Sequence, residues 1–379
     1  MADFSLALLR WFKANGRELP WRQTHDPYPI WLSEIILQQT RVQQGWDYWE
    51  RFMRRWPTVE QLAAATEDEV LREWQGLGYY SRARNLHAAA RQIVQMGGFP
   101  QSLEGIKSLK GVGDYTAAAI GSFAFGLPAA VVDGNVYRVL ARHFGISTPI
   151  NTTAAKHEFA ALAQSLLPLP ATPIPSPTNQ IADYNQAIMD FGAILCTPSS
   201  PQCPTCPLQE TCVAFREGRV GELPVKEKKL VVKTRHLVYI YIRCQGRFAL
   251  HRRGEGDIWQ GLWEPYVIER GERREERGED FRGERREESG ERILSTTMDE
   301  QNCSLSSLLS PLSSKILSTK VLKRNVKHVL THRIIMADFY LLETDTPPQL
   351  PSDYIWIPEE ERDNYAVPRL VELLFESLP

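Results

Sequence analysis

The stretch LKGVGDYTAAAI, residues 109–120, lies between two runs in which apolar residues recur every three or four positions, at 82–95 and 115–125. Gly111 and Gly113 permit a tight turn, and they let the backbone N–H groups at the start of the following helix approach an anion closely. The stretch therefore predicts a helix-hairpin-helix, which can bind DNA phosphates without a high net charge. A plain structural turn between two helices has the same pattern, so the surrounding residues must decide between the two interpretations.

Around this stretch, residues 1–220 predict an almost continuous series of helices. The other helical patterns fall at 30–46, 59–74 and 134–143. Near residue 234 the pattern changes to short β-like segments rich in β-branched and aromatic residues, such as HLVYIYIRC and HRIIMADFYLLE. We therefore expect two domains, with an all-α domain over 1–220, a linker over 221–233 and an α+β domain over 234–379.

The net charge of the 379-residue chain is −2, and residues 1–220 carry 19 Lys and Arg against 19 Asp and Glu. This balance argues against binding of nucleic acid through bulk positive charge, so any nucleic-acid site must be local. The most apolar stretch, Ala117 to Val132, is broken by glycine and proline and is shorter than the ~20 residues that a membrane helix needs. The first 17 residues lack the pattern of a secretion signal. We expect a cytoplasmic protein without a membrane segment, associated with the nucleoid if it acts on DNA.

Residues 270–292 contain 8 Arg and 9 Asp or Glu among 23 residues. The segment RREESGE at 285–291 looks like a fragment of the Nudix hydrolase box, in which paired glutamates hold magnesium. Apolar residues do not recur at helical spacing there, and the glycine-led start of such a box is missing. The composition therefore predicts a charged low-complexity insertion without a packed core.

Four of the six cysteines lie within seventeen residues in the pattern C-x6-C-x2-C-x5-C, with prolines between them. These cysteines are Cys196, Cys203, Cys206 and Cys212. A tight loop with four thiolates can wrap one metal centre. Structural zinc usually uses two separated pairs of ligands, whereas a compact four-cysteine loop suits a [4Fe–4S] cluster. Zinc and ordinary cysteines without a metal remain as alternatives.

The segment VVDGNV at 131–136 places Asp133 after an apolar run and before a glycine, where an aspartate is most often a helix N-cap. The order of helix-hairpin-helix, apolar run, aspartate and four-cysteine loop also resembles one superfamily of DNA glycosylases, and specifically the adenine DNA glycosylases of MutY type. The resemblance is dense over residues ~15–230 and loose over ~234–379. Its further motifs are PWR at 20–22, SEIILQQT at 33–40, GLGYYSRARNL at 76–86 and VDGNVYRVL at 132–140.

Glu34 has apolar neighbours on both sides, at 30–32 and 35–37. A carboxyl group among such residues is poorly solvated, which raises its pKa and leaves a proton to donate near neutral pH. An exposed glutamate in the first turn of a helix is the alternative interpretation. The match of SEIILQQT to the family favours the general acid.

The resemblance implies two carboxyl groups with different roles in glycosidic cleavage. Glu34 protonates N7 of an adenine that has left the base stack, and Asp133 stays ionised and stabilises the oxocarbenium-like sugar, directly or by transient covalent attachment. Tyr115 and Asn135 match positions that line the pocket and orient these acids. Lyases resembling endonuclease III have a lysine where this chain has Tyr115, so the resemblance implies a monofunctional glycosylase that leaves an abasic site.

The resemblance also implies a set of residues that contact DNA or the target base. They are Leu37, Gln38, Gln39 and Thr40 at the duplex, Leu77 and Tyr79 beside the opposing base, Gly111 and Gly113 at the phosphates, and Trp21 and Arg22 near adenine. Asp190 stands where relatives often have glutamate, and it could hydrogen-bond to adenine or water with a shorter reach. Without the resemblance, helix packing and a solvated face explain the aromatic turn and the glutamines equally well.

The second half of the chain resembles the Nudix-like domain of the same family, without the hydrolase box. GDIWQGLWE at 256–264 looks like its glycine–leucine–tryptophan–glutamate turn, and HVLTH at 328–332 looks like the hairpin that senses 8-oxoguanine. We expect Thr331 and His332 to contact the lesion, although Leu330 stands where relatives usually have phenylalanine. Asp114 places a negative charge inside the phosphate-binding hairpin, where we expect it to weaken DNA affinity.

Together these features predict a monomeric, monofunctional DNA glycosylase with one [4Fe–4S] cluster, which acts on double-stranded DNA and removes adenine paired with 8-oxoguanine or guanine. A pyrimidine or thymine mismatch glycosylase of the same superfamily is one alternative, but such enzymes lack the domain at 234–379. A catalytically silent DNA-damage binding protein is another, and the presence of both Glu34 and Asp133 counts against it. A Nudix phosphohydrolase is disfavoured because the metal box is missing.

Overall fold

The computed structural model describes residues 2–168, 179–227, 231–276, 316–330 and 333–379. It divides into two compact units, Met1–Lys228 and Lys229–Pro379. The division lies within the segment 221–233 that the sequence assigns to a linker.

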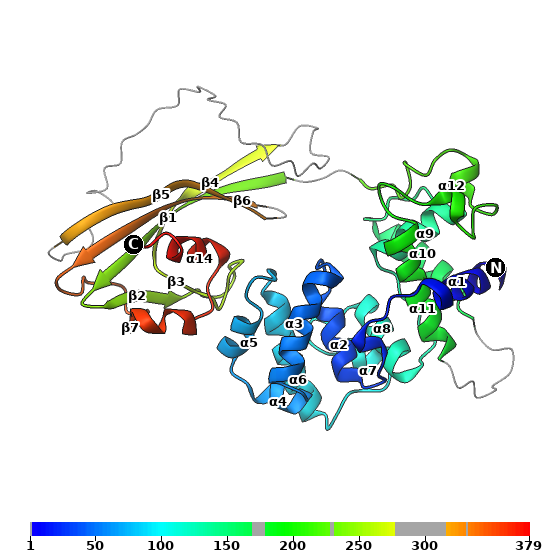
Figure 1. Cartoon of the computed structure of the whole chain (residues 1–379), viewed down its shortest axis with the longest axis horizontal. Coiled ribbons are helices and arrows are strands. Elements are labelled where there is room, and N and C mark those ends of the chain that lie inside the picture. Colours follow the sequence, from blue (N-terminus) through cyan, green and yellow to red (C-terminus); the bar gives the residue numbers. More distant parts are fainter. Residues whose placement is uncertain (1, 169–178, 228–230, 277–315, 331–332) are drawn as a thin grey trace. The chain divides into compact units, whose positions relative to one another are not determined.

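The first unit consists of helices joined by turns and loops (Figure 1). In chain order they are α1 (Ala2–Asn15), η1 (Pro20–Arg22), α2 (Pro27–Ile36), α3 (Val42–Arg55), α4 (Val59–Ala64), α5 (Glu67–Glu73), α6 (Ser81–Gln95), α7 (Leu103–Lys107), α8 (Asp114–Phe125), α9 (Gly134–Phe144), α10 (Thr153–Ser165), α11 (Gln180–Asp190), η2 (Phe191–Leu195), η3 (Cys203–Thr205) and α12 (Val213–Arg216). Among the described residues, no helix is both long enough and apolar enough to cross a membrane.

Two of the predicted helices are interrupted, and each interruption has a local cause. The pattern at 30–46 is split between α2 and α3, because Gln39 has a φ of 57°, in the left-handed region that a right-handed helix cannot contain. The pattern at 59–74 is split between α4 and α5. The Thr66 hydroxyl accepts a hydrogen bond from the backbone N–H of Glu69 at 3.3 Å and so begins a new helix.

The predicted helix-hairpin-helix is formed by α7, α8 and the turn between them. Gly111 has a φ of 77°, and a Cβ atom there would lie 2.7 Å from Cβ of Asn85, so both backbone conformation and space require glycine. Gly113 is the N-cap of α8. Asp114, in the first turn of α8, forms an ion pair with Lys107 of α7. The unusual negative charge of the hairpin is therefore partly offset within the hairpin itself.

Two aromatic-rich groups of side chains hold the helices together. One joins α1 with α8, α9, α10 and α11 and includes the fully buried Phe159 and Phe191. The other includes the buried Phe52 of α3 and Trp74 beyond α5, whose rings pack edge to face with centroids 5.9 Å apart. Helix α2 also packs against α8. The core thus sets the positions of the helices that carry Glu34 and Tyr115.

The second unit is a mixed β-sheet with a C-terminal helix, α14 (Arg369–Phe375). Its strands are β1 (Val231–Cys244), β2 (Arg247–Arg252), β3 (Trp263–Glu264), β4 (Tyr266–Glu276), β5 (Ile316–Val329), β6 (Arg333–Thr344) and β7 (Tyr354–Pro358). The strand order is β3-β2-β1-β6-β5, with β4 also paired to β1 and β7 to β2, and only β1 and β6 run parallel among these pairs. The predicted fold class, an all-α domain followed by an α+β domain, is confirmed.

The predicted insertion at 270–292 is wrong over its first residues. Residues 270–276 extend β4, and the backbone of 272–276 pairs with 231–235 of β1. The composition did not predict this strand, because charged residues are on average depleted in strands. They are nevertheless accepted where a neighbouring strand is available for backbone pairing. The rest of the insertion, including RREESGE, lies outside the described residues.

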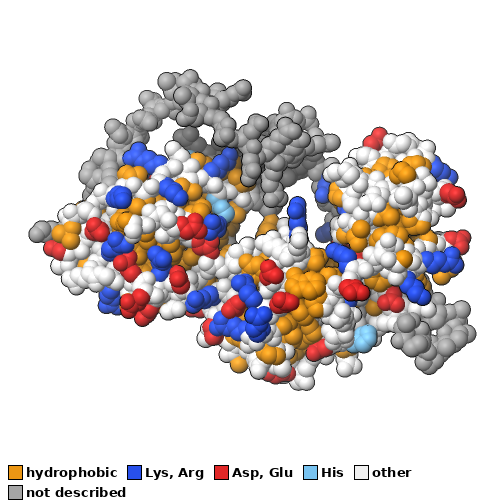
Figure 2. All heavy atoms as spheres, viewed as in Figure 1, with side chains coloured by type: hydrophobic (Ala, Val, Ile, Leu, Met, Phe, Trp, Pro, Cys, Tyr) orange, Lys and Arg blue, Asp and Glu red, His pale blue; other side chains and the backbone are white. Residues whose placement is uncertain are grey.

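Acidic and basic side chains are interspersed over the visible surface of both units (Figure 2). This distribution agrees with the equal numbers of Lys+Arg and Asp+Glu, 19 of each, in residues 1–220. A nucleic-acid site in the helical unit must therefore come from local features, such as helix N-termini and inserted side chains.

Candidate active site and cysteine loop

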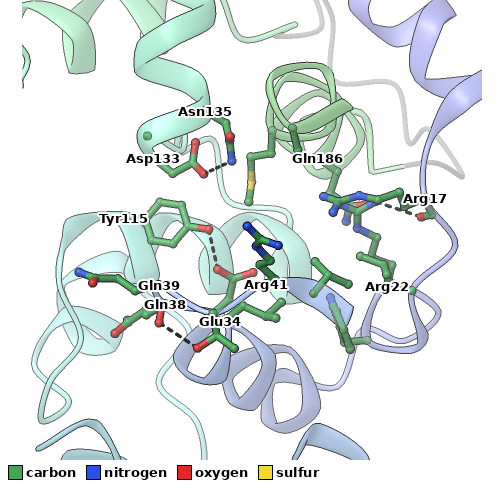
Figure 3. Close-up of a pocket in the computed structure, with 18 of the residues that line it drawn as sticks. Arg17, Arg22, Glu34, Gln38, Gln39, Arg41, Tyr115, Asp133, Asn135 and Gln186 are labelled. Carbon is green, nitrogen blue, oxygen red and sulfur yellow. Dashed lines mark hydrogen bonds between the residues drawn. The ribbon is translucent and has the colours of Figure 1, made fainter. Parts of the chain in front are cut away.

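A cavity of about 800 Å³ opens in the helical unit between residues of η1, α2, α8, α9 and α11 (Figure 3). The predicted residues that line it are Trp21, Arg22, Glu34, Leu37, Gln38, Gln39, Thr40, Tyr115, Asp133 and Asn135. Those that lie outside its lining are Leu77, Tyr79, Gly111, Gly113 and Asp190. The cavity is also lined by residues that the sequence did not single out, among them Arg17, Arg41, Arg138, Gln186 and Met189.

Glu34 lies in the last turn of α2 and is 8% exposed. The alternative interpretation, an exposed glutamate in the first turn of a helix, is wrong. Burial raises the pKa of its carboxyl group to about 7; a hydrogen bond from Tyr115 opposes this shift and the charge of Asp133 adds to it. A carboxyl near the negative end of a helix also gains nothing from the macrodipole in its ionised form. Glu34 is therefore a carboxylic acid that keeps a proton available near neutral pH.

Tyr115, in the first turn of α8, binds the carboxyl group of Glu34. Its hydroxyl donates a hydrogen bond to Oε2 of Glu34 at 2.7 Å. Burial and the nearby charges of Glu34 and Asp133 raise the pKa of this hydroxyl well above its ordinary value of 10.0. Tyr115 is thus a permanent donor that orients Glu34, and its side chain offers no amine for attack on a sugar.

Asp133 is the N-cap of α9, across the cavity from Glu34 (Figure 3). Its Oδ1 accepts from the backbone N–H of Val136 at 2.8 Å, and its Oδ2 accepts from Nδ2 of Asn135 at 2.8 Å. Burial raises the pKa of Asp133 above its ordinary value, although these two hydrogen bonds and the charge of Arg138 oppose the shift. Asp133 therefore has two hydrogen-bond donors and a helix N-terminus to stabilise its charge, whereas Glu34 has one donor and faces a helix C-terminus. The two environments favour a charged Asp133 and a neutral Glu34.

Arg138, which the sequence did not indicate, connects Asp133 to the cysteine loop. Its Nη2 donates to Oδ1 of Asn135 at 2.8 Å and to the carbonyl of Gly192 at 2.6 Å, and its Nε donates to the carbonyl of Cys196 at 2.7 Å. The side-chain amide of Asn135 is therefore held at both atoms, since its Nδ2 donates to Asp133 and its Oδ1 accepts from Arg138. The sequence signals for Arg138 are its place in the motif VDGNVYRVL and its position three residues after Asn135 on the same helix.

Asp190, at the end of α11, is fully buried and binds two arginines of the cavity wall. Its oxygens accept hydrogen bonds from Arg17 and from both terminal nitrogens of Arg22, the latter at 2.9 Å. Burial alone would raise its pKa, but the hydrogen bonds from Arg22 and Arg17 lower the pKa to about 2. The predicted contact of Asp190 with adenine is therefore wrong, because its oxygens are already engaged behind the cavity wall. Asp190 instead fixes Arg22.

We expect Asp190→Asn to destabilise the protein by about 3 kcal/mol at pH 7, because it leaves two arginines without their buried counter-charge. The stabilisation by Asp190 is present above its unfolded pKa of about 4 and is lost as pH falls toward 2. The difference in free energy of unfolding between the variant and the parent should therefore shrink at low pH. Urea unfolding at pH 7 and pH 3.5 measures this difference. Asp183→Asn on the same helix is a matched control, because burial raises the pKa of Asp183. Equal losses in both variants would contradict this role.

The predicted DNA-contact residues outside the cavity lie in two turns of the same unit. Leu77 is buried, whereas the Tyr79 ring is 47% exposed and its backbone has a φ of 48°. Gly111 and Gly113 lie in the hairpin before α8. Both groups remain predictions as DNA contacts.

The four predicted cluster ligands follow α11 in one continuous loop. All four are free thiols and half-buried. Burial raises the pKa values of Cys203, Cys206 and Cys212, and the charges of other cysteines of the loop add to each shift. Arg142 holds the loop by donating to Sγ of Cys196 at 3.4 Å and to the carbonyl of Thr197 at 2.8 Å. Four soft thiols on one loop are the donor set of an iron–sulfur cluster.

No three His, Cys, Asp or Glu side chains in the described parts of the chain are grouped so that they could hold a metal ion as they stand. The fit of the cysteine loop to a cluster therefore rests on its donor chemistry, four thiols on one loop.

In the second unit, Glu264 of the GLWE turn is 1% exposed and belongs to a closed polar network. It accepts hydrogen bonds from Tyr239 at 3.1 Å, from His251 at 3.0 Å and from Arg253. This glutamate is thus a structural residue of the sheet. The predicted lesion-sensing residues Thr331 and His332 lie outside the described residues, between the ends of β5 and β6.

Comparison with known proteins identifies both units. Residues 32–165 match the model of the HhH-GPD superfamily base excision DNA repair protein, and residues 238–377 match that of the NUDIX domain. The helical unit is also similar to the solved structure of a thermostable thymine-DNA glycosylase, with a TM-score of 0.50, 31% identity and coverage of 56% of this chain and 95% of that one.

Several similar proteins are adenine DNA glycosylases. The chain is 33% identical over 263 residues to the one from Buchnera aphidicola of Schizaphis graminum, and the match covers 69% of this chain and 73% of that protein. It is 38% identical to the Arabidopsis thaliana protein and 42% identical to the Homo sapiens protein, where the matches cover 69% and 56% of this chain but only 47% and 39% of those relatives. The chain therefore belongs to the adenine DNA glycosylases, a family of hydrolases that cleave N-glycosyl bonds.

Proposed function

We propose that this protein removes adenine mispaired with 8-oxoguanine or guanine in double-stranded DNA, by hydrolysis of the N-glycosyl bond of a base that has left the stack. The observation that carries this proposal is the pair of carboxyl groups across one cavity, Glu34 with a hydrogen bond from Tyr115 and Asp133 at the N-terminus of α9. Their environments differ as the two roles require.

In the proposed reaction, Glu34 donates its proton to N7 of adenine, so that the base departs as a neutral molecule. Asp133 stabilises the positive charge that develops on the sugar, and Asn135 holds Asp133 at Oδ2. Water then completes the hydrolysis and leaves an abasic site. Since Tyr115 supplies no amine, the strand stays intact and the enzyme is monofunctional.

The cysteine loop supports a second part of the proposal, that Cys196, Cys203, Cys206 and Cys212 hold one [4Fe–4S] cluster. The cluster would brace the loop whose Cys196 carbonyl accepts a hydrogen bond from Arg138. Arg138 in turn binds Asn135, so an ordered loop would help to fix Asp133.

We expect the purified protein to be yellow-brown, to absorb near 400 nm and to contain about four irons per chain. Iron analysis and the visible spectrum of protein purified without oxygen test this expectation. A colourless, zinc-loaded and fully active protein would refute the cluster.

We further propose that the protein acts as a monomer on chromosomal DNA in the cytoplasm. The supporting observation is that Glu34, Tyr115 and Asp133 line one cavity within the helical unit.

Mispair specificity can be tested by single-turnover assays on duplexes with A:8-oxoG, A:G, A:T and T:G pairs. We expect the rate of adenine release to be highest on A:8-oxoG, lower on A:G and undetectable on A:T, with no thymine released from T:G. Thr331→Ala should reduce the ratio of the first two rates, because it removes the hydroxyl expected at the lesion. Equal rates on A:8-oxoG and A:T would refute the proposed specificity.

A further inference from the structure

Arg82, the second residue of α6, binds two loops that are distant in sequence. Its Nη1 donates to the carbonyls of Ile35 at 3.0 Å, Ile36 at 3.1 Å and Gln38 at 2.5 Å. Its Nη2 reaches the carbonyls of Leu77 and Gly78, each at 3.4 Å. One guanidinium thus joins the loop after α2 (residues 37–41) to the turn before α6 (residues 76–80).

The acceptors in the first loop are carbonyls at the end of α2, which carries Glu34. The last carbonyls of a helix have no partner within the helix, and a cation there is favoured by the macrodipole. The planar fork of arginine can serve several carbonyls at once, which a lysine ammonium cannot do with the same geometry. Arg82 therefore caps α2 in trans.

The guanidinium of Arg82 also lies beside two aromatic rings. Its guanidinium carbon lies 5.1 Å from the ring centroid of Trp74 and 5.6 Å from that of Tyr79. Its Nε is buried without a hydrogen-bond partner among the described residues. The guanidinium therefore donates its hydrogen bonds from its two terminal nitrogens. No carboxylate of the described chain forms an ion pair with it.

Both loops contain a residue with a strained backbone at a predicted DNA contact. Gln39 has a φ of 57° and Tyr79 a φ of 48°, in the left-handed region that residues other than glycine rarely adopt. Such conformations persist only where the surroundings enforce them. The carbonyls of Gln38 and Gly78 belong to the peptide planes whose rotation sets these two φ angles. By holding both planes, Arg82 holds both strained residues.

We propose that Arg82 is a positioning residue that locks the Gln39 loop and the Tyr79 turn into one rigid unit for extruding adenine from the duplex. The inference rests on the proposed function, because it requires that these two loops contact DNA. Arg82 does not line the cavity, and its action precedes the chemistry at Glu34. Its loss should therefore impair extrusion more than cleavage.

Arg91 provides a matched control on the same helix. It also donates to backbone carbonyls, those of Ala63 at 3.3 Å and Ala65 at 3.4 Å, at the junction of α4 and α5. The described backbone has no left-handed residue at that junction, and none of its residues is a predicted DNA contact. Arg91→Lys thus removes a comparable tie without touching either loop.

The test compares Arg82→Lys, Arg91→Lys and the parent in single-turnover adenine release from two A:8-oxoG duplexes. One duplex is fully paired and the other has mismatches on both sides of the adenine, where extrusion is easier. We expect Arg82→Lys to be slower than the parent by about 30-fold on the paired duplex and by about threefold on the mismatched one. The substitution should make extrusion of adenine more costly, and flanking mismatches should remove most of that added cost. Arg91→Lys should stay within about twofold on both, as for a substitution outside the site.

Equal defects of Arg82→Lys on the two duplexes would overturn the inference alone, because Arg82 would then act only on the chemistry or on the fold. Release of no adenine by the parent from either duplex would overturn the proposed function and this inference with it.

A second measurement applies even if Arg82→Lys is too unstable for assay. Asparagine adopts left-handed backbone conformations more readily than glutamine. The loss in melting temperature caused by Arg82→Lys should therefore be smaller in a Gln39→Asn background than in the parent. Strictly additive losses would overturn the coupling between Arg82 and Gln39.

Discussion

Glu34→Gln is expected to lower the single-turnover rate of adenine release by about 10³-fold, within the range for loss of a general acid. Glutamine keeps the shape of the side chain and can still accept the hydrogen bond from Tyr115, but it has no proton to give. The parent should lose activity as pH rises through about 7, the pKa to which burial raises Glu34. Binding to the mispaired duplex should change little.

The same substitution should stabilise the fold at high pH. In the parent, the unfolded chain ionises Glu34 near pH 4.5 and the folded chain near pH 7, so ionisation destabilises the folded state by about 3 kcal/mol once the pH exceeds 7. The gain from Glu34→Gln should be absent below pH 4.5, rise from there to pH 7 and then level off.

Glu50→Gln is the control, since exposed Glu50 accepts one hydrogen bond from Trp46 at 2.8 Å, as Glu34 does from Tyr115. It should leave the rate and the stability nearly unchanged. Residual turnover of Glu34→Gln within tenfold of the parent would mean that another group is the acid.

Asp133→Asn is expected to reduce adenine release by about 10³-fold, as for loss of one group that stabilises developing charge. Asparagine is as good an N-cap as aspartate, and its Oδ1 can still accept from Val136. The helix should therefore remain. The hydrogen bond from Asn135 to Oδ2 is lost, so we expect some loss of stability and a much larger loss of rate. Single-turnover kinetics together with thermal unfolding separates these two effects.

Asp26→Asn is a matched control for Asp133→Asn. Asp26 is the N-cap of α2, where it accepts from the backbone N–H of Tyr28 at 2.9 Å, and it does not line the cavity. It should keep nearly full activity. A similar rate loss in both variants, or a melting temperature of Asp133→Asn far below that of Asp26→Asn, would show that Asp133 acts mainly as a cap.

The fold class could be predicted from local sequence patterns, but the interruptions of the predicted helices could not. Apolar residues on both sides of the polar stretch 38–41, up to Leu37 and again at Val42 and Trp46, predicted one helix where Gln39 forms a turn. In that turn the carbonyl of Gln38 accepts a hydrogen bond from Arg82, which lies 43 positions beyond Gln39 in the sequence. Tertiary hydrogen bonds of this kind override local propensity and have no periodic signature. The end of β4 was missed for a related reason, because its partner β1 lies in a separate segment.

The residues of the candidate site were predictable where each lies in a recognisable motif. They were less predictable where an ion pair joins residues that are distant in the sequence. Glu34, Tyr115 and Asp133 come from three motifs and line one cavity. Asp190 was placed in contact with adenine because its partners, Arg17 and Arg22, are about 170 residues away and their pairing is invisible in the sequence. Gln186, Met189 and Asp190 recur at helical spacing on α11, which was an available but unused signal for Gln186 and Met189.

The most direct test of the account is to identify the base that the full-length protein releases from an A:8-oxoG duplex, and to examine the strand before and after alkali. Mass spectrometry should detect free adenine, and the strand should stay intact until alkali cleaves it at the abasic site. Release of thymine from T:G without any release of adenine would contradict the account, and so would strand cleavage by the enzyme alone.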